Sequence, residues 1–158
     1  MWLYNLHYFD DLLSFNADEK RELHFKLIER WINENPPFFG IGWDSYPISL
    51  RIVNIYKYWL NGNNINDKIS SSLIKQYLYL KANPELHLLG NHYFSNLKAI
   101  FFSEVVLGLE DKRLKTFELI MEQLEEQVLS DGMNFELSPM YHDLMLVDLL
   151  DIFNLIQS

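Results

Sequence analysis

The chain has 158 residues, of which 49% are hydrophobic and 15% aromatic, and its formal net charge is −9. Such a composition excludes an intrinsically disordered chain, and the acidic balance disfavours nucleic acid as a partner, because phosphate binding needs clustered Lys and Arg. The absence of cysteine excludes disulfides, thiolate metal sites and a cysteine nucleophile. No apolar run approaches the roughly 20 residues of a membrane span, and the N-terminus lacks a signal-peptide pattern.

Apolar periodicity predicts six helices, so the expected fold class is all-α. In chain order, the helices are expected over about 20–33, 46–60, 65–81, 92–107 and 112–129, with the sixth running from about 138 to the end. Pro36-Pro37 ends the first helix, and Gly108 is a suitable C-cap for the fourth. Asn134–Leu137 is only a weak strand candidate.

For two of the helices the sequence predicts which apolar residues are buried or exposed. The first helix should bury one apolar face, formed by Leu23, Leu27, Ile28, Trp31 and Ile32. The aromatic-rich start of the chain and the apolar run at its end are typical of a piece cut from a larger protein. An apolar face of the last helix should therefore be exposed, with Leu146, Leu149, Leu150 and Phe153.

The second, fourth and sixth helices are entered through segments rich in polar and aromatic residues, namely Trp43–Pro47, Leu89–Tyr93 and Phe135–His142. Their spacing is 46 positions from Ser45 to Asn91 and 48 from Asn91 to Pro139, about one helical hairpin per repeat. Equivalent helices of such an array are parallel, so the three segments are expected at one rim, facing one groove. Ordinary polar hairpin loops are the alternative.

The pairs Asn91-His92 and Tyr141-His142 are the strongest candidates for chemistry. They offer an amide donor, two groups that titrate near neutral pH, and a phenol. A zinc site made by His92, His142 and Glu136 competes with this interpretation, but HExxH and an i, i+4 His pair are both lacking. No metal or cofactor is therefore predicted. An inverting glycosidase that uses Glu136 and Asp44 is the second enzyme hypothesis.

At these residues the chain resembles the helical domain of the heparinase II/III-like polysaccharide lyases, which include related alginate lyases. The matching stretches follow the family's order and are Asn5–Asp10, Asn35–Pro37, Gly42–Arg51, His87–His92 and Phe135–His142. The last two are the most specific. Similar sequences include bacterial proteins linked to surface polysaccharide.

The resemblance implies part of an incomplete (α/α) toroid made of helical hairpins, followed by an antiparallel β-sandwich domain. Residues 1–158 would be part of the one toroid domain, without the sandwich that is expected to pack on it and without a further catalytic His or Tyr. The chain by itself is then expected to be inactive. A degradative lyase of this kind would be periplasmic or secreted.

Family members cleave acidic polysaccharides, such as glycosaminoglycans or alginate, by β-elimination. Their motif residues correspond to Asn91, His92 and Tyr141. The first two would neutralise the uronate carboxylate, and Tyr141 would act as base, as acid, or as both. The expected substrate-binding residues are Tyr46, Arg51, Glu136, His142 and Trp43. A carbohydrate-binding or scaffold protein without turnover remains the alternative of a different class.

Overall fold

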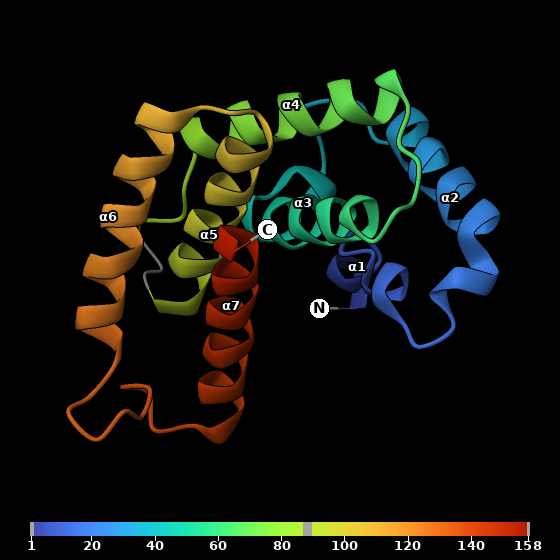
Figure 1. Ribbon diagram of the computed structural model, residues 1–158. Coiled ribbons are helices and arrows are strands. Elements are labelled where there is room, and N and C mark those ends of the chain that lie inside the picture. Colours follow the sequence, from blue (N-terminus) through green and yellow to red (C-terminus); the bar gives the residue numbers. More distant parts are fainter. Residues whose placement is uncertain (1, 87–89, 158) are drawn as a thin grey trace. The chain divides into compact units, whose positions relative to one another are not determined.

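The computed structural model describes residues 2–86 and 90–157, which fold into helices without a named strand (Figure 1). The predicted all-α class is therefore confirmed. The α-helices are α1 (Trp2–Asn5), α2 (Arg21–Glu34), α3 (Ser45–Leu60), α4 (Asp67–Ala82), α5 (Gly90–Val106), α6 (Glu110–Gln127) and α7 (Pro139–Gln157). Short 3-10 helices are η1 (Asp10–Leu13), η2 (Ala17–Lys20) and η3 (Ile41–Trp43).

All six predicted helices are present, with ends within about two residues of the expected ones. Helix α1 and the three 3-10 helices were not predicted, because each is too short to show an apolar period. The weak strand candidate forms only one isolated bridge, between Val128 and Asn134. None of the described helices has the length and hydropathy needed to cross a bilayer.

The chain divides into two compact units, Met1–Pro84 and Glu85–Ser158. The incomplete toroid stays a prediction, and each unit is described by itself. In the first unit α3 is the central helix, with its buried apolar residues on several sides, including Ile48, Ile52, Val53 and Ile55. Helix α4 packs one stripe against α3 and α2, formed by Ile69, Leu73, Tyr77 and Leu80. Its N-terminus is capped by Asn66, whose Oδ1 accepts from the Ile69 amide at 3.0 Å.

The predicted buried face of α2 is partly wrong. Helix α2 buries His24, Ile28 and Trp31, whereas Leu23 and Leu27 are 52% and 41% exposed. The helix is therefore turned so that a histidine takes a core position. Helix α4 and the short helix η2 pack against α2.

In the second unit α5 is the central helix, and every residue from Phe94 to Glu104 is buried. Helix α6 packs along it, and Thr116 donates a hydrogen bond to the buried Glu104 carboxylate at 2.6 Å. Helix α7 packs on α5 through few residues, since only Met145, Ile152 and Leu155 are buried.

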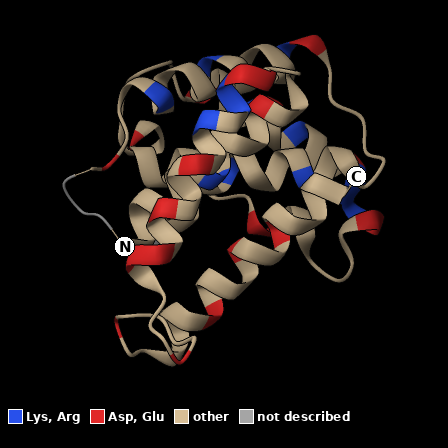
Figure 2. Ribbon diagram, turned by 60° about the vertical axis from the view of Figure 1, so that its left-hand side comes forward, with Lys and Arg blue, Asp and Glu red and all other residues tan. Residues whose placement is uncertain are grey.

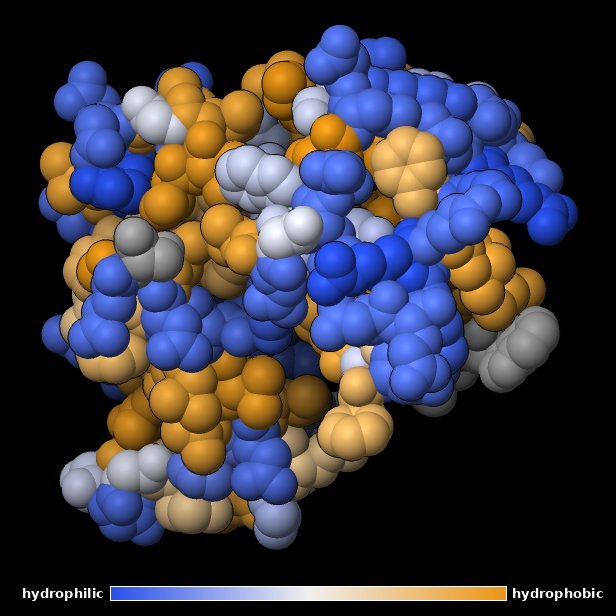
Figure 3. All heavy atoms as spheres, turned by 45° about the vertical axis from the view of Figure 1, so that its right-hand side comes forward, coloured by the Kyte–Doolittle hydropathy of each residue, from blue (hydrophilic) through white to orange (hydrophobic). Residues whose placement is uncertain are grey.

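The opposite face of α7 exposes large hydrophobic residues, as predicted for Leu146, Leu150 and Phe153, which are between 47% and 56% exposed. Leu149 is only partly exposed. Hydrophobic side chains (orange) also reach the surface shown in Figure 3, among hydrophilic ones. The same helix carries three acidic residues and no Lys or Arg (Figure 2).

Candidate active site

Asn91 and His92 lie in the first turn of α5, directly after Gly90. Gly90 has a φ of 52°, which a side-chain-bearing residue rarely adopts, so glycine suits the sharp entry into the helix. The Nδ1 atom of His92 lies 3.2 Å from Oε2 of Glu85. The Glu85 amide donates to Oδ1 of the fully buried Asn96 at 2.8 Å. Glu85, which contacts His92 from the segment before α5, is thus fastened to the helix itself.

Tyr141 and His142 lie in the first turn of α7, and both side chains are half-buried. The segment before them is held by the buried Asn134, whose Oδ1 accepts from the Glu136 amide at 3.0 Å. The Phe135 amide donates to the Gln127 carbonyl at 2.8 Å, which fastens the same segment to the end of α6. The entry into α7 is therefore a structured loop with a defined path.

The N-termini of α5 and α7 lie at the same end of the second unit. Oε1 of Glu136 is 3.5 Å from the position of a Cβ atom built on Gly90. Further along, Lys98 binds Asp148 and Asp151, and Phe101 lines the same pocket as Leu155. Residue numbers rise together along both helices, so the helices are parallel, with α6 running the other way (Figure 1). Five candidate residues therefore share one end, namely Asn91, His92, Glu136, Tyr141 and His142.

The remaining candidates, Trp43, Tyr46 and Arg51, belong to the first unit. Arg51 is fully buried, and its guanidinium donates to Gln76 Oε1 at 2.8 Å, to the His7 carbonyl at 3.0 Å and to the Gly42 carbonyl at 2.8 Å. Burial lowers the pKa of this guanidinium. A structural role explains Arg51 better than the substrate-binding role predicted from the sequence.

Trp43 is also a core residue, with 3% of its surface exposed. Its ring packs against Phe38 and Tyr79, with centroids 5.1 Å and 5.6 Å away. Its indole N–H donates to the Asn35 carbonyl at 3.4 Å. Tyr46 differs, because it is half-buried and packs edge-on against Tyr8 at 6.0 Å. Of the three, Tyr46 retains the surface that a substrate contact needs.

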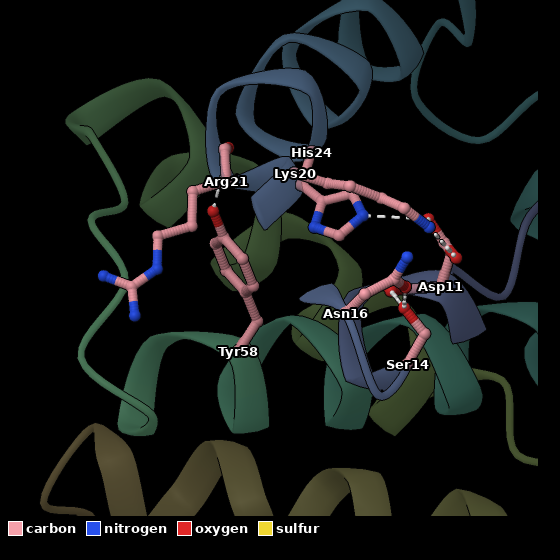
Figure 4. Close-up of polar contacts among 7 residues, drawn as sticks. All are labelled: Asp11, Ser14, Asn16, Lys20, Arg21, His24 and Tyr58. Carbon is pink, nitrogen blue, oxygen red and sulfur yellow. Dashed lines mark hydrogen bonds and ion pairs between the residues drawn. The ribbon is translucent and has the colours of Figure 1, made fainter. Parts of the chain in front are cut away.

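A polar cluster that was not predicted from the sequence fastens η1 to α2 (Figure 4). The buried ring of His24 points its Nε2 atom at Asp11 Oδ2, 2.9 Å away, and Lys20 reaches the other carboxylate oxygen at 3.1 Å. Hydrogen bonds from His24 and then Lys20 hold the pKa of the Asp11 carboxyl below its usual range. No sequence pattern marks this pair, because Asp11 and His24 lie 13 positions apart and His24 falls outside the apolar face predicted for the first helix.

His7 was likewise not among the predicted site residues. Its Nδ1 atom accepts a hydrogen bond from the Trp31 indole at 2.9 Å, and its ring lies against Gly42. Burial, followed by the Arg51 charge, lowers the pKa of His7, and the Asp44 carboxylate opposes this shift. The Asn5–Asp10 stretch was noted for its family resemblance, and that signal could have identified this histidine.

Three features bear on other chemistries. Within residues 2–86 and 90–157, no three His, Asp or Glu side chains gather as a metal site would require. Burial, followed by the nearby Glu122 charge, raises the pKa of Tyr93 in the first turn of α5. The two carboxylates of the alternative glycosidase hypothesis, Asp44 and Glu136, belong to different units.

Comparison with protein families matches residues 11–158 to the family described as Heparinase II/III N-terminus. Neither the curated proteins nor the solved structures gave a significant match. The match covers all five candidate residues that share one end of the second unit, as well as Trp43, Tyr46 and Arg51.

Proposed function

We propose that this chain, which belongs to the heparinase II/III family, is the helical part of a lyase that cleaves uronic-acid-containing polysaccharide by β-elimination. The family itself supports polysaccharide as the class of substrate. The proposal of β-elimination by these residues is supported by the parallel packing of α5 and α7. Their first turns hold Asn91, His92 and Tyr141 at one end of the second unit.

The chemistry explains why an amide and an imidazole are needed together. β-Elimination removes the proton on C5 of the uronate, next to its carboxylate, and breaks the bond from C4 to the leaving oxygen. Negative charge builds on the carboxylate as the proton leaves. Hydrogen-bond donors from Asn91 and His92 would stabilise that charge, as donors of an oxyanion hole do. The first turn of a helix adds a favourable dipole for an anion.

Glu85 would support His92 in this role. A carboxylate acceptor 3.2 Å from Nδ1 accepts a hydrogen bond from that nitrogen and fixes the plane of the ring, so the imidazolium form of His92 would donate to the substrate from Nε2–H. Fixed donors stabilise developing charge more effectively than mobile ones, because no reorganisation is needed during the reaction. Glu85 is thus proposed as a positioning residue, and His92 as the group that meets the substrate.

Tyr141 is proposed to transfer the proton. Its phenol would remove the C5 proton, protonate the departing O4, or do both in a syn elimination. Glu136 and His142 flank it in sequence and are proposed to contact the sugar. The β-sandwich domain and the further catalytic residue implied by the family resemblance are part of this proposal, and turnover is expected to need them.

The test measures product absorbance on a protein that carries both this chain and the proposed β-sandwich domain. Heparosan, hyaluronan and alginate are the substrates. A lyase produces a 4,5-unsaturated uronate that absorbs near-ultraviolet light, a hydrolase produces a reducing end without that absorbance, and a binding protein produces neither. Absence of the absorbance with all three polymers would overturn the proposal.

Variants then test the assignment of roles. Tyr141→Phe should lower kcat by roughly 10²–10⁴-fold with little change in binding, because proton transfer needs the hydroxyl. Asn91→Ala should lower kcat by roughly 10²–10³-fold. Tyr79→Phe is the matched control, since the Tyr79 ring packs in the aromatic cluster of the first unit. A hydrolase would instead be disabled by Glu136→Gln and spared by Tyr141→Phe.

A further inference from the structure

His7 has a fixed orientation and a fixed tautomer. Its Nδ1 accepts the Trp31 indole N–H at 2.9 Å, so the neutral ring must carry its proton on Nε2. The Nδ1–Cε1 edge packs so closely on Gly42 that an added Cβ would lie 2.7 Å and 2.9 Å from these two atoms. The lowered pKa of His7 keeps the ring neutral near pH 7.

The backbone around His7 is clamped by α3. Arg51 donates to the His7 carbonyl at 3.0 Å, and Asn54 donates to the Tyr8 carbonyl at 2.9 Å. Arg51 and Asn54 are three positions apart and lie on one face of α3. Arg51 also packs on the Trp31 ring, 3.9 Å from its centroid. The segment that carries the imidazole is therefore rigid, as a preorganised binding group requires.

The second ring nitrogen of His7, Nε2, is not used in these contacts. The His7 ring is half-exposed, and its Nε2–H donates to no acceptor among the described residues. A histidine that only satisfied Trp31 would need Nδ1 alone. The opposite edge of the ring therefore presents a neutral hydrogen-bond donor at the surface of the first unit.

Asp44 supplies an acceptor near this donor. The Tyr4 hydroxyl donates to Asp44 Oδ2 at 2.6 Å, while Oδ1 has no hydrogen-bond partner in the described part of the chain. Asp44 is exposed, and its charge is close enough to act on the pKa of His7. Tyr4 connects the two residues, because its carbonyl accepts from the His7 amide at 2.9 Å while its hydroxyl holds the Asp44 carboxylate.

We infer that His7 and Asp44 form a sugar-hydroxyl subsite, in which Nε2–H of His7 donates to one glycan oxygen and Oδ1 of Asp44 accepts from a hydroxyl. The inference rests on the proposed function for the choice of a glycan as ligand. A hydroxyl both donates and accepts, so it matches this pair. A uronate carboxylate would meet the Asp44 charge and is disfavoured there. The subsite therefore selects an uncharged part of the polysaccharide.

The first experiment observes the imidazole nitrogens of the ¹⁵N-labelled chain by NMR. Tetrasaccharides of heparosan, hyaluronan and alginate are the probes, with glucuronic acid alone as the anionic control, and His7→Gln identifies the His7 signals. The spectrum should show the Nε2–H tautomer, and at least one tetrasaccharide should shift this signal whereas glucuronic acid does not. No shift with any tetrasaccharide, or a shift with glucuronic acid alone, would overturn the subsite.

Variants separate binding from packing. His7→Phe should weaken tetrasaccharide binding roughly 3–10-fold, the effect of one hydrogen bond, and His7→Gln should lose less because its amide can donate. Trp31→Phe should leave the ring in place but produce a mixture of tautomers. Asp44→Asn should raise the relative affinity for glucuronic acid, and Asp18→Asn, an exposed carboxylate on η2, is the matched control.

The two proposals fail in different ways. If no polymer yields the unsaturated product but the tetrasaccharide still shifts His7 Nε2–H, the lyase proposal fails and the subsite stands. If the enzyme is active and His7→Phe, folded as judged by its circular dichroism, keeps the parental KM and dissociation constant, the subsite is wrong and the lyase proposal stands. If His7→Phe does not fold, His7→Gln becomes the deciding variant. The subsite is then wrong if His7→Gln keeps the parental tetrasaccharide affinity and Asp44→Asn does not change the relative affinity for glucuronic acid.

Discussion

Each of the two units has one buried cation in its central helix, and the two cations are stabilised in different ways. Among the described residues, Arg51 of α3 meets only uncharged acceptors, two backbone carbonyls and the Gln76 amide, with the Trp31 ring against its guanidinium. Lys98 of α5 meets two carboxylates, Asp148 at 2.7 Å and Asp151 at 2.6 Å. The first unit therefore contains a cation among dipoles, and the second a compact ion cluster.

The chemistry of the two side chains explains this difference. A guanidinium spreads its charge over a plane, is weakly hydrated and directs five N–H donors, so neutral oxygens and an aromatic face can replace water. An ammonium is a strongly hydrated point charge, and burying it without carboxylates is costly. As a result Arg51 connects three separate segments of the first unit, whereas Lys98 connects α5 to α7 alone.

The largest expected effect is that of Lys98→Met. It would leave two carboxylates, whose side chains are only 18% and 14% exposed, without their cation. We expect a loss of about 3–5 kcal/mol in the free energy of unfolding, measured with urea. Lys112→Met, on the exposed surface of α6, should change it by less than about 0.5 kcal/mol.

Adding Asp148→Asn and Asp151→Asn to Lys98→Met should restore part of the lost stability, because no uncompensated charge then remains. If the triple variant were less stable than Lys98→Met alone, the carboxylates would have a role besides balancing the lysine, and the interpretation of the cluster would be wrong.

Arg51→Lys should have the next largest effect, although it keeps the charge. One ammonium cannot reach Gln76, His7 and Gly42 together, so at least one buried acceptor loses its partner. We expect a loss of about 2–3 kcal/mol in urea unfolding. Arg30→Lys, in an exposed pair with Glu34, is the control with little expected change. If Arg51→Lys lowers the free energy of unfolding as little as the control does, the positive charge is what stabilises this region and the planar geometry of the guanidinium is not needed.

Gly42→Ala tests how tightly the Arg51 region is packed. Gly42 has no positive φ, so its cost would come from contacts of the new Cβ, 2.7 Å from His7 Nδ1 and 3.2 Å from Trp31 Cζ2. Overpacking of this kind costs about 1–3 kcal/mol. Combining it with His7→Ala should cost less than the sum of the two single changes, and additive costs would contradict the proposed clash.

The smallest expected effect is on the pH dependence of the free energy of unfolding, to which His7 of the first unit contributes. Because the pKa of His7 is lowered in the folded chain, the unfolded state takes up a proton first as the pH falls below about 6.5. This histidine therefore contributes to a loss of stability from that pH downward, until the folded ring is also protonated. Urea unfolding between pH 5 and 8 should show a shallower pH dependence in His7→Gln, and an identical slope would argue against a depressed pKa.

Local sequence patterns were sufficient to predict the helices and their repeat. Apolar residues recur with a helical period, and proline, asparagine and glycine mark the ends, so α2 to α7 could be placed from local patterns. The same reasoning indicated that α5 and α7 begin at equivalent points of successive hairpins. These features depend on residues close together in the chain, and local propensity and spacing therefore suffice to predict them.

Which polar residues are buried and which remain accessible depends on contacts between distant segments of the chain. Arg51 and Trp43 were expected to contact substrate but are enclosed by the N-terminal segment, η3 and α4, and His24 entered the core through its bond to Asp11. The burial of a charge depends on whether acceptors from distant segments can replace water around it. No local pattern encodes that condition, because the acceptors lie 9 to 44 positions away from Arg51 in the chain.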